Sequence, residues 1–285
     1  VGSDVSYNTN TESYVAWCAK LGGAPTATNS AGAGATPTAG SVKIDGVNLG
    51  SALAGTIAAT KITANTTLGM SVGTYTGTGS ANETIATGLT GCEMIIVKRT
   101  DTTYGWAVWH SGLTDDYSML LNTTAAQVNS GYWDTSGNTS TLIELGTDSE
   151  AVNKSGQPYY FMAFAPSQFI SIGTYEGNNN ANGPFIPCVN SAGVPLMPIW
   201  TMLKVIDTTT SNWVIMDAGR NLYNANTLGL YPNSTAAETT VAGWSDFVSG
   251  GIKLRSTNMN AVAGFITLTI GIPIIDTDGR IRAGR

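Results

Sequence analysis

The chain has 285 residues, enough for one large domain or two modest ones, and only 11% of them are charged. The net charge of −6, from 13 Lys and Arg against 19 Asp and Glu, argues against a nucleic-acid-binding protein, because such surfaces need clustered basic side chains. Glycine is frequent, at 34 residues, but proline, at 10, is not, so neither a collagen-like nor a proline-rich disordered chain fits. No apolar run approaches the roughly 18 residues of a membrane span, and we expect no membrane insertion.

Residues 1–20 resemble the end of a repeat that recurs later in the chain. Tyr14–Cys18 matches the hydrophobic run Phe161–Ala165 in pattern. We therefore expect residues 1–20 to be the closing strands of a preceding copy, packed with a full unit or a neighbouring subunit, since Tyr14 and Trp17 would not be left in water. On this interpretation the native polypeptide is longer.

Residues 21–69 are rich in Gly, Ala and Thr and form a connector. Val42–Leu49 alternates apolar and polar residues around an Asp45-Gly46 pair, which predicts a short β-hairpin, and Ile57–Ile62 is a second apolar stretch. A connector of this composition buries little within one chain, so we expect its apolar residues to contact another copy in a homo-oligomer. Those residues are Ile44, Val47, Leu49, Leu53, Ile57 and Ile62.

Residues 70–166 and 167–285 carry the same motifs in the same order, which predicts two copies of one unit. Ser71–Gly77 returns almost unchanged as Ser171–Gly177. In both halves a Lys, an Asp-Thr-Thr triplet and a Trp then follow in series: Lys98, Asp101–Thr103 and Trp106 in the first, and Lys204, Asp207–Thr209 and Trp213 in the second.

Both units contain short β-branched and aromatic runs separated by Gly, Asn, Asp and Thr clusters, and neither contains a convincing helix. The pattern predicts an all-β fold of duplicated antiparallel β-sandwich, jelly-roll-like units with an ordered connector. The first unit spans 70–166, and the second spans 167–285 including a C-terminal tail. Trp106 and Trp213 are expected at equivalent buried positions.

Five segments together resemble a repeated domain of unknown function found in large virion proteins of tailed marine bacteriophages: Tyr14–Lys20, Ser41–Gly46, Gly73–Gly77, Ile95–Lys98 and Trp106–Ser111. The resemblance covers nearly the whole chain. In that family the repeats often follow a lectin-like jelly-roll domain in tail-fibre or other virion-surface proteins. The resemblance therefore implies a structural or adsorption role and supplies no catalytic residues.

The end of the second copy departs from the family pattern. Thr267–Pro273 replaces the aromatic-rich closing strand, and Asp276–Arg280 resembles a chain-end hairpin. We expect Arg285 to lie near the natural C-terminus.

No group of residues predicts catalysis. The one histidine, His110, aligns with Asp217 of the second copy, which favours a hydrogen-bonding position at a strand end over a catalytic base. The acids Asp115-Asp116, Glu93, Asp134 and Glu144 show no pairing of the kind that glycoside hydrolysis needs, and Asp101 and Asp207 fit turn capping.

We expect no metal site and no cofactor. Asp276-x-Asp278-Gly279 matches only the opening of a calcium loop, and the Gly177–Pro184 cluster is typical of a loop that tolerates positive φ. Calcium stays a minor alternative. The cysteines Cys18, Cys92 and Cys188 are too far apart for a zinc pattern and are expected to be buried.

Three aromatic residues in loop-like surroundings are the candidate binding residues: Tyr132, Trp133 and Trp244. They could contact a glycan or a neighbouring subunit, and packing inside the unit is the alternative.

Together these observations and the resemblance predict a structural virion protein of a tailed bacteriophage, a fibre or surface appendage that presents a host-contacting surface. It would lie on the particle surface or tail and have no enzymatic activity. The expected partners are further copies of the chain, as a trimer if it is a fibre, and other virion proteins. The alternatives are a receptor-recognition module that binds host surface glycans and a capsid-decorating protein.

Overall fold

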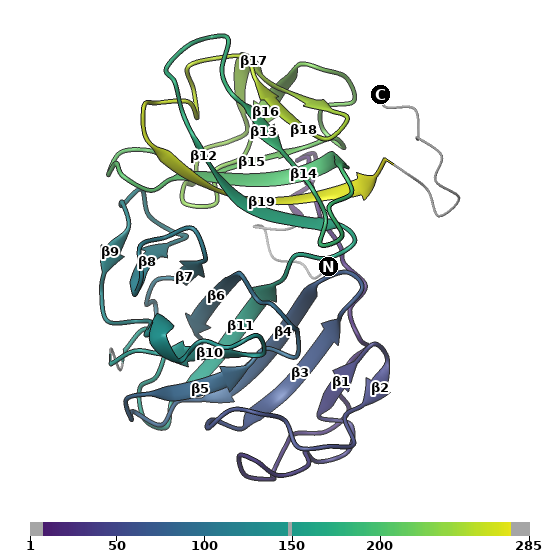
Figure 1. The fold of residues 1–285 in the computed structure, drawn as a ribbon, viewed down its shortest axis with the longest axis vertical. Coiled ribbons are helices and arrows are strands. Elements are labelled where there is room, and N and C mark those ends of the chain that lie inside the picture. The colour runs from purple at the N-terminus through teal and green to yellow at the C-terminus, as the bar shows by residue number, and fades with distance from the viewer. Residues whose placement is uncertain (1–7, 148–149, 275–285) are drawn as a thin grey trace.

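A computed structural model describes residues 8–147 and 150–274 (Figure 1). Regular structure in this part consists of nineteen β-strands and one short 3-10 turn, η1 (Thr135–Gly137), which confirms the prediction of an all-β protein. The strands form a lower half, ending with β11 (Pro158–Phe164), and an upper half, beginning with β12 (Ile170–Glu176), stacked in Figure 1.

The lower half contains a nine-stranded sheet and a two-stranded sheet. All neighbours in the large sheet are antiparallel except β1 and β3. Its order is β2 (Val47–Asn48), β1 (Val42–Ile44), β3 (Ala59–Asn65), β4 (Met70–Thr76), β11, β6 (Met94–Arg99), β7 (Ala107–His110), β8 (Tyr117–Leu120) and β9 (Val128–Asn129). The small sheet pairs β5 (Glu83–Ala86) with β10 (Leu142–Leu145).

The upper half contains two four-stranded sheets. One has the order β12, β19 (Gly264–Pro273), β14 (Leu196–Val205) and β15 (Val214–Asp217). The other has the order β13 (Phe185–Pro187), β18 (Gly251–Leu254), β17 (Thr239–Val248) and β16 (Asn226–Gly229).

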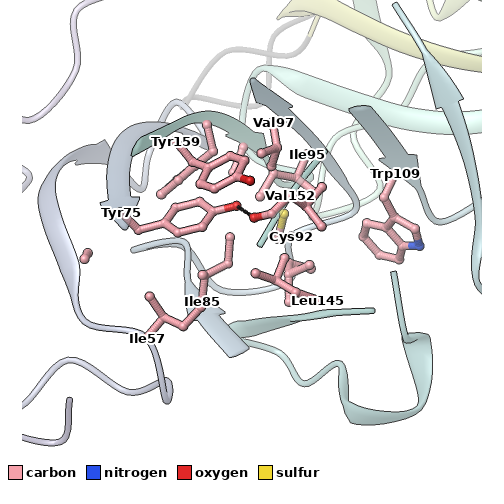
Figure 2. Packing of buried hydrophobic residues seen from close by; sticks show 14 of the residues in the cluster. Ile57, Tyr75, Ile85, Cys92, Ile95, Val97, Trp109, Leu145, Val152 and Tyr159 are labelled. Carbon is pink, nitrogen blue, oxygen red and sulfur yellow. Dashed lines mark hydrogen bonds between the residues drawn. The ribbon is translucent and has the colours of Figure 1, made fainter. Parts of the chain in front are cut away.

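The core of the lower half is built around two stacked tyrosines. Tyr75 of β4 stacks on Tyr159 of β11 with ring centroids 5.1 Å apart, and its hydroxyl donates to the carbonyl oxygen of Val152 at 2.6 Å. Figure 2 shows the two rings with Ile85 of β5 and Leu145 of β10 on the opposite side of the core. Such a stack adds about 0.5–1.5 kcal/mol to the free energy of burial.

The core of the upper half has a corresponding pair. Tyr175 of β12 stacks on Phe265 of β19 at 4.6 Å, and the Tyr175 hydroxyl donates to the carbonyl oxygen of Met259 at 2.6 Å. Each hydroxyl thereby has a hydrogen-bond acceptor inside an apolar core, where an unpaired donor would cost about 1–3 kcal/mol.

A third apolar cluster, which we call the seam, lies between the two halves. β6 and β14 contribute to the seam with one face and to the core of their own half with the other, so successive residues are apolar in each: Met94–Val97 in β6 and Met202-Leu203 in β14. The lower half supplies Met94, Ile96, Val108, Leu113, Met119 and Phe164; β12 supplies Ile170; and the rest of the upper half supplies Met202, Ile206, Trp213, Ile215, Ile266 and Leu268.

The connector is part of the lower sheet, which corrects one expectation. The hairpin is present, with β1 paired to β2 and both Asp45 and Gly46 at positive φ. However, β3 pairs with β4 and Ile57 bridges to Ile85 of β5, so Ile57 and Ile62 are both buried in the core of the same chain. Ile44, Leu49 and Leu53 also pack against that core, and only Val47 of the six apolar residues is exposed. The inference that these residues require a second copy is therefore wrong.

The N-terminal segment also differs from its expected structure. The described residues 8–20 contain no strand, and Tyr14 and Trp17 are 51% and 46% exposed. Cys18 is exposed too, whereas Cys92 and Cys188 are buried as predicted. Within the described part of the chain, no strand pairs with residues 8–20. Residues 1–7 lie outside the described part.

Trp106 and Trp213 have matching backbone contacts but unequal burial. Their backbone N–H groups donate to the side-chain oxygens of Asn122 and Asn233 at 2.9 and 2.8 Å. Trp213 is buried, as expected, whereas Trp106 is only half-buried. The difference arises because the Trp213 ring enters the seam and donates through Nε1 to the carbonyl oxygen of Leu120 at 3.1 Å.

Candidate functional site

The three aromatic residues nominated for binding lie mostly inside the protein. Trp133 and Trp244 are 2% and 4% exposed, and they belong to the cores of the lower and upper halves. Tyr132 is half-buried against the lower core. Neither indole presents a free face to a sugar, so packing, the alternative interpretation, describes both tryptophans in this structure.

Three acids near η1 are held by hydrogen-bond donors of the same turn. Asp116 Oδ1 accepts from the backbone N–H and the hydroxyl of Thr135 at 2.7 and 2.8 Å, and Asp134 caps η1 by accepting the N–H of Ser136. Burial raises the pKa of the Glu144 carboxyl, and the neighbouring Asp134 charge raises it further. This arrangement orders the turn.

Asp101 and Asp207 hold their turns in different ways. Asp101 forms an ion pair with Arg99 at 2.6 Å, whereas Asp207 Oδ2 accepts the backbone N–H of Gly264 at 3.0 Å. The Arg99 guanidinium holds the pKa of Asp101 below its usual value. The common turn-capping role expected from the sequence is thus replaced by two separate contacts.

His110 joins the two halves. Its Nε2 lies 3.2 Å from the carbonyl oxygen of Thr267 in β19, and its Nδ1 accepts the backbone N–H of Gly112 at 2.9 Å. Because Nδ1 is the acceptor, Nε2 carries the proton and the ring is neutral. Burial lowers the pKa of His110 to about 4. Both ring nitrogens are used by backbone groups, so the ring makes a structural contact.

Asp217, the residue that aligns with His110, holds the loop after β15. Its carboxylate accepts from the backbone N–H and the Nε of Arg220 at 2.9 and 2.7 Å. Arg220 also pairs with Glu238 at 2.6 Å. The carboxylate is therefore engaged by the Arg220 guanidinium and orders this loop.

The two aligned lysines bind loop carbonyls. Lys98 Nζ donates to the carbonyl oxygens of Arg99, Thr102 and Tyr104 at 2.6–2.8 Å. Lys204 Nζ donates to those of Ser211 at 2.9 Å and of Thr124, in the other half, at 3.2 Å. Burial lowers the pKa of Lys204 to about 8.

The seam opens at one end into an apolar cleft of about 620 Å³. Met70 and Phe164 of the lower half and Trp200 and Ile270 of the upper half form its walls, and residues 15–19 run along it. Trp17 meets Trp200 edge to face, with ring centroids 6.1 Å apart. The cleft is suited to apolar side chains.

This cleft was not predicted from the sequence. The available signal is the pair of aromatic residues Tyr14 and Trp17 in a short apolar segment, but this pattern predicts a strand rather than the wall of a cleft. The partner ring, Trp200, lies 183 positions further along the chain, so no local pattern could connect the two.

The asparagine-rich loop forms the turn that the sequence predicts. Asn178 N–H donates to Asn260 Oδ1 at 2.8 Å, Asn180 N–H to Asn178 Oδ1 at 3.0 Å, and Asn182 N–H to Asn180 Oδ1 at 2.8 Å. The side-chain oxygens of this loop are thus used for successive Asx turns.

Within residues 8–147 and 150–274, no group of three or more His, Cys, Asp or Glu side chains is placed to hold a metal ion. The Asp276 and Asp278 motif lies outside the described residues. The same described part contains no helix with the length and apolar character that crossing a membrane would require.

Comparison with known protein families assigns the chain to one family. Residues 45–268 match the family described as a domain of unknown function (DUF7483), and the chain belongs to this family. No curated protein and no solved structure matches the chain.

Proposed function

We propose that this chain is a structural protein of a tailed-bacteriophage virion, a fibre or surface appendage without enzymatic activity. The observation that carries the structural role is the correspondence between its two halves, which we propose to be two copies of one β-sandwich, jelly-roll-like unit. The bacteriophage origin is supported by the sequence resemblance described above.

The strand order supports duplication. The sequence β4, β11, β6, β7 in the lower sheet corresponds to β12, β19, β14, β15 in the upper sheet. Pairing registers also correspond, because Tyr75 lies opposite Tyr159 and Tyr175 lies opposite Phe265. Each pair stacks in the same way.

Loop contacts support it further. Asn153 Oδ1 accepts the backbone N–H of Thr78, and its Nδ2 donates to the carbonyl oxygen of Ser80, both at 2.8 Å. Asn260 makes the same two bonds with Asn178 and Asn180 at 2.8 and 2.7 Å.

The seam suits a load-bearing spacer. Equivalent strands of the two units face one another across it: β6 and β7 from one unit meet β14 and β15 from the other. An apolar contact between sheet faces resists rotation of one unit against the other, as a rigid appendage requires.

Other virion proteins, and further copies of the chain, are the proposed partners. A trimer is supported only by the resemblance to phage fibres, since the connector is satisfied within its own chain. Light scattering over a dilution series measures this directly: a mass above the 29.5 kDa monomer supports self-association.

The location is tested on intact particles. Antibodies against the chain, coupled to gold, should label the tail or surface of purified virions of the phage that encodes it. The same gene product detected only in infected-cell lysate, with unlabelled particles, would contradict the proposal.

A glycan array tests the alternative role, receptor recognition. Retention of a saccharide would favour that role, for which the buried Trp133 and Trp244 provide no support.

A further inference from the structure

The upper sheet ends at β12, and the other edge of this strand is open. β12 pairs with β19 over its full length, and no strand in the described part of the chain pairs with its opposite edge. The carbonyl of Gly173 accepts from the Thr267 hydroxyl of β19, so it points inward. Since alternate residues of an antiparallel strand direct their backbone groups to opposite sides, the backbone groups of Ile172 and Thr174 point to the open edge.

The corresponding edge in the lower half is covered. β4 shares Ser-x-Gly-Thr-Tyr with β12, and β3 pairs along its outer edge. In that pairing Ile62 of β3 lies opposite Gly73 and is fully buried. β3 thus shows what kind of strand this sequence accepts.

Gly173 marks a place that β12 leaves unfilled. A Cβ on Gly73 would lie 2.4 Å from the Phe161 ring and 3.0 Å from Ile62, so packing requires glycine there. A Cβ on Gly173 would have only the Thr267 hydroxyl within 4 Å, at 3.9 Å. The half-buried glycine therefore has room beside it, and glycine inside a strand often marks the close approach of another backbone.

The open edge also lacks the usual protection against pairing. Natural edge strands carry lysine, proline or bulges that discourage an added strand. β12 contains none of these residues, its pairing with β19 has no register shift, and its one charge, Glu176, is at the strand end. Thr174 and Glu176 are exposed, so the edge is accessible near its C-terminal end.

We infer that the β12 edge is a binding site for an extended strand of another polypeptide with the chemistry of β3: rich in Thr and Ala, with a β-branched apolar residue that lies opposite Gly173. Strand addition of this kind draws affinity from main-chain hydrogen bonds and specificity from the side chains that fill the adjoining space. The site rests on the likeness of β4 and β12 and is independent of a virion location.

The direct probe is a fluorescent peptide of residues 57–66, the sequence of β3 with its flanks, added to the whole protein. We expect saturable binding by fluorescence anisotropy and slower amide hydrogen exchange over residues 170–176. The edge of β4 is a built-in control, because the chain's own β3 already occupies it. Absence of saturable binding would overturn the inference.

Two variants of β12 sharpen the test. Thr174→Pro removes an edge N–H at an exposed position, and Gly173→Ile fills the space meant for the incoming side chain; each should weaken binding by on the order of tenfold or more. Thr174→Val keeps the backbone donor and should bind like the unmodified protein, and a peptide with Ile62→Asp should not bind. Denaturant unfolding verifies that each variant is folded. If Thr174→Pro does not fold, Gly173→Ile alone tests whether the peptide binds at the β12 edge.

Self-pairing is the competing occupant. A concentration-dependent dimer that Thr174→Pro abolishes, together with no binding of the peptide, would assign the edge to β12 of a second copy and overturn the β3-type partner. Equal binding to all variants would overturn any role of β12.

Discussion

Residues at equivalent positions do different work in the two halves. His110 ends β7 and bonds to Thr267 across the seam, whereas Asp217 ends β15 and holds its own loop through Arg220. Lys98 bonds only within its turn, but Lys204 reaches Thr124 of the other half. At both positions one residue serves its own unit and the other serves contact between the units.

His110 makes stability depend on pH. Its pKa is lowered by burial from 6.5 to about 4, so between these values the unfolded chain binds a proton that the folded protein does not. The free energy of unfolding should therefore fall as pH drops through this window, by roughly 3 kcal/mol in total, and His110 should add no further loss below it.

Denaturant titrations from pH 7 to 4 measure this effect. The same titrations of His110→Gln, whose side chain does not titrate, give the pH dependence of the free energy of unfolding that is due to the carboxylates. Subtracting it leaves the contribution of His110. Because the chain has one histidine, an NMR titration reports its pKa without assignment. A midpoint near 6.5 in the folded protein would show that the ring is not buried as described.

Elements of like sequence are placed in different surroundings. β4 is an interior strand covered by β3, and β12 is an edge strand. Tyr14–Cys18 resembles Phe161–Ala165, at the end of β11, in its apolar pattern, but residues 8–20 form no strand. Position in the sheet thus decides what the same motif contributes.

The glycines of these two strands should respond differently to substitution. Gly73→Val drives a side chain into Phe161 and should cost about 1–3 kcal/mol or more. Gly173→Val has open space and should change the free energy of unfolding by no more than about 0.5 kcal/mol. Urea unfolding of the matched pair checks this, and equal losses would mean that Gly173 is also closely packed.

The N-terminal segment should be held weakly. Trp17→Ala removes the edge-to-face contact with Trp200 and should cost about 0.5–1.5 kcal/mol, because the ring is nearly half exposed. Limited proteolysis should then cut residues 8–20 faster while the two halves stay intact. An unchanged cleavage rate would indicate that Trp17 does not hold the segment.

At the scale of the whole molecule, the seam couples two units that each have their own core. Hydrogen bonds between the halves accompany its apolar contacts, among them those that Trp213, Gln127, Lys204 and His110 form. A contact of this kind makes the halves unfold together as long as it is intact.

Trp213→Ala should break this coupling. The ring is fully buried in the seam, so its loss should cost about 3–5 kcal/mol and divide one calorimetric transition into two. The half-buried Trp106 is the matched control, and its replacement by Ala should cost only roughly 1 kcal/mol. A single transition in Trp213→Ala would mean that the coupling lies elsewhere.

Much of the fold was predictable from local pattern. The Asp45-Gly46 turn, the strands around Tyr75 and Tyr175, and the loop that contains Asn178 and Asn180 were all visible in the sequence. The candidate site was not. Trp133 and Trp244 stand among turn residues, yet both rings enter cores formed by strands distant in the chain.

The sequence by itself determined that the protein is all-β and low in charge, with a series of motifs that occurs twice, because strand periodicity, turn chemistry and motif order involve residues close together. Only the tertiary structure decided that β3 completes the lower sheet, that the connector needs no second copy, and that β12 has a single partner strand among the described residues. These outcomes depend on contacts between residues such as Ile62 and Gly73 or Trp17 and Trp200, which become neighbours only when distant segments pack. Burial of apolar surface is non-directional, so composition predicts that such residues will be covered and leaves the covering partner to be decided by the fold.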